Sequence, residues 1–206
     1  MLKLVFALPE EARVVRRRVR GVFGGQEVSL SFVGIGAGRI AELQRSVELT
    51  KPRMVISSGF AGATRSLLEP GDFVLSTNYT DADIAEFLSR QKIFDAAGPF
   101  FQVQQVASAS AKWSLNRSQG AVAVDMESEA IASLCRRKGI PLVTARMISD
   151  AIDEAIPAIF SKRKFSGLKD LGDATVFAAR MLRLTGKLAD RLEALVRALP
   201  RSGERD

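Results

Sequence analysis

The sequence has 206 residues, of which 47% are hydrophobic and 26% are charged, and it carries a formal net charge of +7 at pH 7. This length and apolar content predict a single globular domain over residues 1–206. The chain contains no histidine and one cysteine, Cys135, which excludes an internal disulfide, histidine-dependent nucleophiles and the usual zinc sites. Acid–base chemistry must therefore rest on carboxylates, and we expect no bound metal. A lone thiol on an apolar helix face favours the cytoplasm.

The positive charge leaves a nucleic-acid binder as one interpretation. However, aromatic residues make up only 7% of the chain, and no basic strand carries interleaved aromatic side chains. We therefore expect any nucleic-acid binding to be electrostatic, without sequence preference. No apolar run reaches membrane-spanning length, and the chain opens directly on a strand-like segment. We expect neither a spanning helix nor a signal peptide.

The N-terminal part predicts two strands with a helix between them. Leu2–Leu8 is an apolar strand, and Pro9, followed closely by Glu11, begins the helix. The second strand, Glu27–Val33, leads into GIGAGRIA (Gly34–Ala41), a glycine turn that opens another helix. Such a turn suits a backbone that approaches an anion or polar ligand. Tight strand-to-helix packing explains it about as often.

The middle of the chain predicts shorter elements. A third strand, Pro52–Ser58, runs into a second glycine turn, and further strands are predicted at Phe73–Ser76 and Phe100–Val106. Residues 83–99 predict a short helix followed by a glycine–proline loop. Ser108–Gln119 predicts a loop with one helical turn.

A strand–helix–strand unit occupies Ala121–Asp150. The strand Ala121–Val124 ends at Asp125, which is typical of a helix N-cap, and the helix ends near Gly139 before a second apolar strand. Such a unit predicts a parallel pair, with Glu127 and Asp150 at the carboxyl edge of one sheet. Open α/β sheets bind ligands at that edge, so these two carboxylates are candidates for one active site.

From about Asp170 a long amphipathic helix is predicted, whose arginines and lysines lie on other faces than its leucines. The apolar positions are Phe177, Met181, Leu184, Leu188, Leu192, Leu195 and Leu199. We expect this face to pack on the domain or on a sister subunit. A sharper hypothesis is that the basic helix makes peripheral contact with anionic membranes.

With these stretches in hand, the chain resembles the superfamily of purine nucleoside phosphorylases and methylthioadenosine/S-adenosylhomocysteine nucleosidases. The matching segments, in the family's order, are Ala7–Ala12, Gly34–Ala41, Ser57–Ser76, AVAVDMESEAIA (Ala121–Ala132) and ARMISD (Ala145–Asp150). The most specific feature is VDMES followed about twenty residues later by RMISD. In length the chain is most similar to the subgroup of hopanoid-associated phosphorylases, which are thought to remove adenine from adenosylhopane.

The resemblance implies an α/β fold with three layers, α/β/α, and a twisted central mixed sheet flanked by helices. It implies an enzyme, a homo-oligomer, that cleaves the N-glycosidic bond of a purine nucleoside, most simply an adenine nucleoside. No cofactor is implied, and phosphate is a co-substrate only in a phosphorylase. A hopanoid lipid carrying the adenosyl group is a further implied substrate.

The resemblance also implies roles for individual residues. Asp150 matches the acid that protonates N7 of the leaving purine, and Glu127 matches the acid that holds a ribose hydroxyl, with Met126 against the sugar. Glu11 matches the glutamate that activates water, and Arg146 is expected beside Asp150 and Glu127. The substrate-binding set is completed by Gly36, Gly59, Phe60 and Ala61. Because three carboxylates would share one cleft, we expect the pKa of Asp150 to be raised.

Departures from the family pattern affect the nucleophile and the base. Phe60 stands where many relatives have a serine that contacts phosphate or water, and the family's basic phosphate-binding residues are not evident. These departures favour hydrolysis over phosphorolysis. The segment that stacks the base is shortened, and Phe100, Phe101 or Trp113 is expected to replace it. The alternative is a catalytically impaired nucleoside-binding or regulatory protein on the same fold.

Overall fold

Ten strands form one mixed sheet in the described part of the computed structural model, which covers residues 1–154, 156 and 168–200. The sheet order is β2-β3-β1-β4-β10-β5-β9-β8, and β6 pairs with β10 and β7 off this path. The strands are β1 (Leu2–Phe6), β2 (Val22–Phe23), β3 (Gln26–Phe32), β4 (Met54–Ser57), β5 (Phe60–Ala63), β6 (Phe73–Ser76), β7 (Ala96–Gly98), β8 (Phe100–Gln102), β9 (Ala123–Asp125) and β10 (Leu142–Asp150).

The centre of the sheet is parallel and its margins are mixed. Strand β1 pairs in parallel with β3 and β4, and β10 pairs in parallel with β4 and β5. Antiparallel pairs join β2 to β3, β6 to β10 and β5 to β9. Strands β1, β4 and β10 are buried along their whole length, as continuous apolar strands of a covered parallel sheet are.

The predicted parallel strand–helix–strand unit is wrong. Strand β5 lies between β9 and β10, is parallel to β10 and antiparallel to β9, so β9 and β10 run in opposite directions. Gly62 of β5 pairs with Val124 on one side and with Asp150 on the other. Strand β9 therefore ends partway along β10, which brings the residues after Asp125 toward the same part of the sheet as Asp150.

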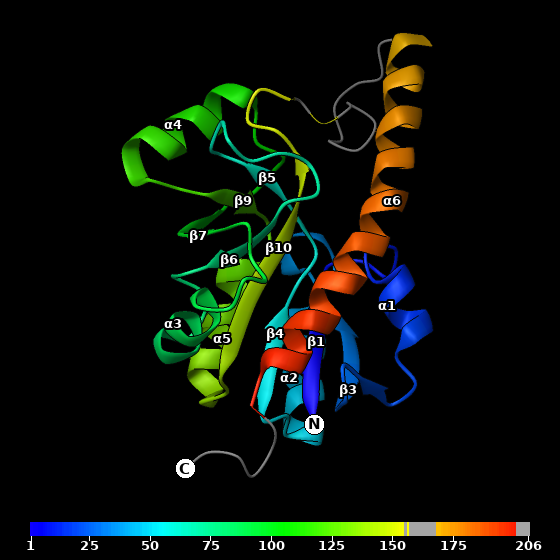
Figure 1. Cartoon of the computed structure of the whole chain (residues 1–206), viewed down its shortest axis with the longest axis vertical. Helices are drawn as coiled ribbons and strands as arrows, with labels where there is room; N and C mark the ends of the chain where they lie inside the picture. Colours follow the sequence, from blue (N-terminus) through cyan, green and yellow to red (C-terminus); the bar gives the residue numbers. More distant parts are fainter. Residues whose placement is uncertain (155, 157–167, 201–206) are drawn as a thin grey trace.

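Helices cover both faces of the sheet (Figure 1). They are α1 (Arg13–Arg18), α2 (Ile40–Thr50), α3 (Ala82–Ser89), α4 (Ala109–Gln119), α5 (Ser128–Lys138) and α6 (Leu168–Ala198), with a short 3-10 helix at Ile35–Ala37. Side chains from α1, α3 and α6 share one core with β1, β4 and β10, and those from α2 and α5 form a second core. The predicted three-layer α/β/α architecture is confirmed.

Two segments of the chain are more regular than expected. Ser108 caps α4 by accepting a hydrogen bond from the Ala111 N–H at 3.2 Å, and the whole segment to Gln119 is helical instead of a loop with one turn. Residues 96–98 form β7 within the segment predicted to be a loop after a helix. The cap on α4 explains why a helix without a strong apolar stripe forms there.

The apolar face of α6 packs on the domain, as predicted. Leu188, Leu192 and Leu195 are fully buried and belong to the same core as β1. In Figure 1, α6 runs beside α1, and Arg18 of α1 pairs with Asp190 of α6 at 2.6 Å. Within the described residues, no helix combines the length and the hydropathy that a membrane crossing requires.

Candidate active site

A cavity of about 220 Å³ brings together Glu11, Glu127 and Asp150. Its walls come from the end of β1, the start of β5, the β9–α5 junction, the end of β10 and α6. A larger cavity of about 410 Å³, beside Cys135 of α5, contains none of these three acids. The smaller one, which we call the acidic cavity, is therefore the candidate site.

Glu11 is held by backbone groups just after β1. Its Oε2 accepts hydrogen bonds from the N–H groups of Ala7, at 3.0 Å, and Leu8, at 3.1 Å. A Cβ on Gly59, whose φ is +142°, would lie 3.0 Å from the same oxygen. Burial raises the pKa of Glu11 to about 7, and the charge of Glu127 adds to the rise. A carboxyl with that pKa can act as a base near neutral pH.

Glu127 is anchored by the first glycine turn. Its Oε1 accepts a hydrogen bond from the Gly36 N–H at 2.9 Å. Burial raises the pKa of Glu127, and the nearby Arg146 charge opposes the rise. Gly36 itself is not among the residues that line the acidic cavity. The glycine turn thus does bind an anion, but that anion is the protein's own carboxylate, so Gly36 positions Glu127 instead of lining the site.

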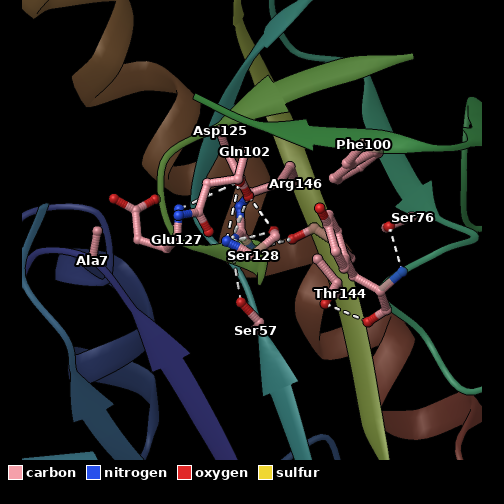
Figure 2. Close-up of polar contacts among 12 residues, drawn as sticks. Ala7, Ser57, Ser76, Phe100, Gln102, Asp125, Glu127, Ser128, Thr144 and Arg146 are labelled. Atoms are coloured by element: carbon pink, nitrogen blue, oxygen red, sulfur yellow. Dashed lines mark hydrogen bonds and ion pairs between the residues drawn. The ribbon is translucent and has the colours of Figure 1, made fainter. Parts of the chain in front are cut away.

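Arg146 is paired differently from the sequence expectation. Its Nη2 lies 2.9 Å from Asp125 Oδ2, and both side chains are buried. The same nitrogen donates to Ser57 Oγ at 3.1 Å and to Ser128 Oγ at 3.2 Å. Figure 2 shows this group between the strands, with Glu127 beside it. Arg146 therefore fixes the β9–α5 junction that carries Glu127, and it has no hydrogen bond or ion pair to Glu127 or Asp150.

Asp150 is fully buried at the end of β10. Its Oδ1 accepts a hydrogen bond from Ser149 Oγ at 2.6 Å, and its Oδ2 is paired with the ammonium of Lys112. The nearest charged partner of Asp150 is thus a cation and not the crowded carboxylates that we expected. Burial raises the pKa values of two other acids of the cavity, Glu11 and Glu127.

Sequence reasoning missed Lys112. It lies in the largely polar helix α4, between Ala111 and Trp113, where a lysine normally marks a solvated face, and nothing in its spacing indicates a buried partner. Lys112 is buried because α4 packs over the end of β10, where it meets Asp150. The other lysine buried in the described part of the chain, Lys3, bonds Ser29 and Ser46 and does not line the acidic cavity.

The apolar walls of the acidic cavity were predicted in part. Phe60, Ala61 and Met126 line it as expected, and Gly59 lies behind Glu11. The three aromatic residues expected to replace the base-stacking segment do not line it. Phe100 is buried in a separate core, and Trp113 donates instead to Asp153 at 2.7 Å. Among the described residues, the aromatic side chains that line the cavity are Phe60 and Phe177 of α6.

The acids of the cavity are not arranged as a metal site in the described residues. Across the residues that the structure places, no group of three or more histidine, cysteine, aspartate or glutamate side chains is arranged to hold a metal ion. Lys112 is the single basic residue among the described residues that line the acidic cavity. The described part of the site therefore offers four carboxylates, of which Asp125 is paired with Arg146, together with one ammonium and an apolar wall.

Comparisons with known proteins place this site in a family. The chain matches the profile of the Phosphorylase superfamily over residues 4–114 and 96–182. The 5′-methylthioadenosine/S-adenosylhomocysteine nucleosidase of Haemophilus influenzae is 31% identical over 190 residues, which cover 74% of this chain and 81% of that protein. The chain belongs to the phosphorylase superfamily, and it is an enzyme of the nucleosidase and nucleoside phosphorylase class, as the motifs implied.

Solved structures share the fold. The nucleosidase of the same name from S. pneumoniae, determined with a transition-state inhibitor, has a TM-score of 0.73 at 18% identity and covers 97% of this chain and 99% of its own. Futalosine hydrolase of Helicobacter pylori has a TM-score of 0.70 at 18% identity over 96% of this chain and 97% of its own. The mixed sheet with flanking helices is thus the architecture of these nucleosidases.

Proposed function

We propose that this protein hydrolyses the N-glycosidic bond of an adenine nucleoside. The observation that carries the proposal is the meeting of Glu11, Glu127 and Asp150 in one cavity. Cleavage of this bond passes through an oxocarbenium-like state, which needs a proton at the leaving base and negative charge near the sugar. The relatives in sequence and structure are named as nucleosidases that act on adenine nucleosides.

The three acids divide the chemistry. Asp150 delivers a proton to N7 of the purine while the electron pair of the C1′–N9 bond moves onto the base. Glu127, which the Gly36 N–H orients, accepts a hydrogen bond from a ribose hydroxyl, with Met126 against the sugar. Glu11 takes a proton from the water that attacks C1′, a role that suits its pKa of about 7.

Water is the nucleophile in this proposal. Phosphate would need cationic side chains aimed at the sugar, and Lys112, the single basic residue lining the described cavity, already has Asp150 as its partner. Arg146 is likewise occupied by Asp125. Among the described residues, the cavity therefore holds carboxylates and no unpaired cation, which disfavours a dianion and favours water. The proposed reaction uses no cofactor.

The apolar part of the cavity points to the 5′ substituent. Leu8, Val106 and Phe177 line it together with Met181, so the substituent that we propose is large and apolar, as in an adenosylated hopanoid lipid. The affinity gain follows the apolar area removed from water, at about 25 cal/mol per Å². A series of 5′-alkylthioadenosines of growing chain length should therefore show KM falling with length. A KM independent of length would remove the lipid substrate and leave a smaller nucleoside.

Release of free adenine from 5′-methylthioadenosine tests the reaction. We expect release at equal rates in phosphate-free and phosphate-containing buffer, with 5-methylthioribose as the other product. Asp150→Asn should lower kcat by a factor on the order of 100 or more, the usual contribution of a general acid. The exposed Asp83→Asn is the matched control. A sugar 1-phosphate product would establish phosphorolysis, and tight nucleoside binding without turnover would establish a binding protein.

The proposal includes a setting for the enzyme. It acts as a homo-oligomer in the cytoplasm, where the free thiol of buried Cys135 stays reduced. Contact with anionic membranes would come from the exposed side of α6, which carries Arg183 and Lys187 beside exposed Leu182. Co-sedimentation with vesicles containing anionic lipid tests that contact. Equal sedimentation with neutral vesicles would remove it.

A further inference from the structure

Lys112 is the only residue of α4 that is buried, and its side chain is 2% exposed. A buried ammonium is costly unless charge and hydrogen bonds compensate it. Here the compensation is complete, because the three hydrogens of the ammonium meet three acceptors. Asp150 Oδ2 is the first, and the carbonyl oxygens of Ala151, at 2.8 Å, and Glu154, at 2.9 Å, are the others. Lys112 has no hydrogen left to offer a ligand.

Lys112 must therefore act through Asp150. Both residues line the acidic cavity, and Gly62 packs against both. A Cβ at position 62 would lie 2.9 Å from Asp150 Oδ2 and 3.3 Å from Lys112 Cε. A side chain on residue 62 would therefore displace the pair.

The pairing creates a chemical problem for the proposed reaction. Asp150 Oδ2 accepts a hydrogen bond from the Lys112 ammonium, and a carboxylate oxygen that accepts a hydrogen bond carries no proton of its own to give to a leaving base. The ammonium, in contrast, holds three, one of them directed at Asp150 Oδ2. Resting on the proposed function, we infer that Lys112 supplies the proton that Asp150 passes to the purine. The acid of this enzyme is then the pair.

The proton reaches the purine in two transfers. One Nζ–H bond of Lys112 breaks as an O–H bond forms on Asp150, and that O–H bond breaks as N7–H forms on the purine. The electron pair of the C1′–N9 bond moves onto the base, while a water oxygen bonds C1′ and gives one proton to Glu11. Lys112 ends as a neutral amine and Glu11 as a neutral acid. Solvent then takes one proton from Glu11 and returns one to Lys112.

Two variants separate a proton supplier from a counter-ion. Lys112→Met keeps the apolar stem without the charge, and Lys112→Arg keeps the charge on a group that does not release its proton. We expect both to lower kcat for adenine release from 5′-methylthioadenosine by about 100-fold with KM changed less than about threefold. Lys92→Met, at an exposed lysine, is the matched control and should keep the wild-type rate.

Three results would overturn the inference. A wild-type rate in Lys112→Arg would make the residue a counter-ion only. An unchanged rate in Lys112→Met would show that the reaction does not need the lysine, and a faster rate would show that the lysine restrains Asp150. A double variant with Asp150→Asn that is much slower than Asp150→Asn alone would show that Lys112 does not act through Asp150.

The melting temperature and the binding of adenine distinguish a folding defect from a loss of function in each variant. Binding of adenine, followed as a rise in melting temperature, reports an intact site in each variant. If Lys112→Met does not fold, Lys112→Gln, which keeps an amide donor toward the same acceptors, takes its place. Absence of adenine release by the wild-type protein would defeat the proposed function itself. Adenine release that is unchanged in Lys112→Met, Lys112→Arg and Lys112→Gln would defeat only the role of Lys112.

Discussion

The guanidinium of Arg146 and the carboxylate of Asp125 form a buried ion pair with a separation of 2.9 Å. Asp125 also accepts a hydrogen bond from the Ser128 N–H at 3.1 Å, so the pair joins β10 to the first turn of α5. Glu127 lies between Asp125 and Ser128 in the sequence. The pair therefore sets the direction from which Glu127 enters the acidic cavity, although neither member is one of the three acids proposed for the reaction.

We predict that Arg146→Met destabilises the protein by about 3–5 kcal/mol, because it leaves Asp125 buried without its partner. The double variant Arg146→Met/Asp125→Asn should recover part of that loss. Urea denaturation measures both. The exposed pair between Arg136 and Glu129 is the control, since its removal by Arg136→Met should cost no more than about 1 kcal/mol. Equal costs at the two arginines would contradict the role assigned to burial.

We predict that Gly62→Ala lowers kcat on the order of 10- to 100-fold, because the new Cβ displaces the Asp150–Lys112 pair. Gly186→Ala is the matched control. A Cβ at Gly186, within α6, meets nothing within 4 Å, and alanine there should raise stability by about 0.5–1 kcal/mol through its helix propensity. Full activity in Gly62→Ala would show that the pair tolerates displacement.

The raised pKa of Glu11 predicts two pH dependences. As a base it must be ionised, so kcat/KM should rise with pH and level off above about pH 7. The folded protein holds the Glu11 proton more tightly than the unfolded chain does. Its contribution to stability is therefore present at low pH and is lost as pH rises from about 4.5 to about 7.

Glu11→Gln removes the Glu11 part of both effects. Its melting temperature should exceed that of the wild type by more at pH 8 than at pH 4, and its residual activity should lose the rise toward pH 7. The pKa of Glu127 is also raised, so the quantity to compare is the difference in melting temperature between the variant and the wild type at each pH. A difference that does not change with pH would contradict the pKa of Glu11.

We predict that the cost of Glu127→Gln depends on the sugar. A hydrogen bond to a charged group contributes about 1.5–3 kcal/mol, so kcat/KM for the ribonucleoside should fall roughly 10- to 100-fold. The nucleoside that lacks the contacted hydroxyl should lose little further activity in the variant. Parallel assays of the 2′-deoxy and 3′-deoxy substrates identify that hydroxyl. Equal losses on all three sugars would place Glu127 elsewhere in the reaction.

The local chemistry of the site was readable because it is encoded in short segments. Glu11 follows an apolar strand and a proline turn, and Asp150 ends the nine-residue buried strand β10. The family motifs then named the roles of these residues, and the amphipathic pattern of α6 correctly predicted its buried face. What these features share is that each depends on neighbours within about one turn or one strand of the chain.

Features that depend on distant pairing were not readable. Placing β5 between β9 and β10 reverses the predicted parallel pair, and no local pattern in Ala121–Asp150 encodes that insertion. Arg146 was expected near Glu127, and its charge does act on Glu127, but its ion-pair partner Asp125 was not predicted, because that partner is set by how β10 and α5 meet. Lys112 was missed because an isolated lysine in a polar helix is normally solvated.

The burial of Lys112 also bears on the motions of α4. Helices α5 and α6 are docked by several buried apolar side chains, whereas α4 buries a single charged one. The Lys112–Asp150 pair thus anchors α4 together with the hydrogen bonds that Trp113 and Asn116 donate, so transfer of a proton within the pair during a catalytic cycle would loosen the helix. In amide hydrogen exchange, α4 should be among the first helices to open, and a bound purine that engages Asp150 should change its exchange rate. The exchange rate of α4 would then indicate whether Asp150 has transferred its proton.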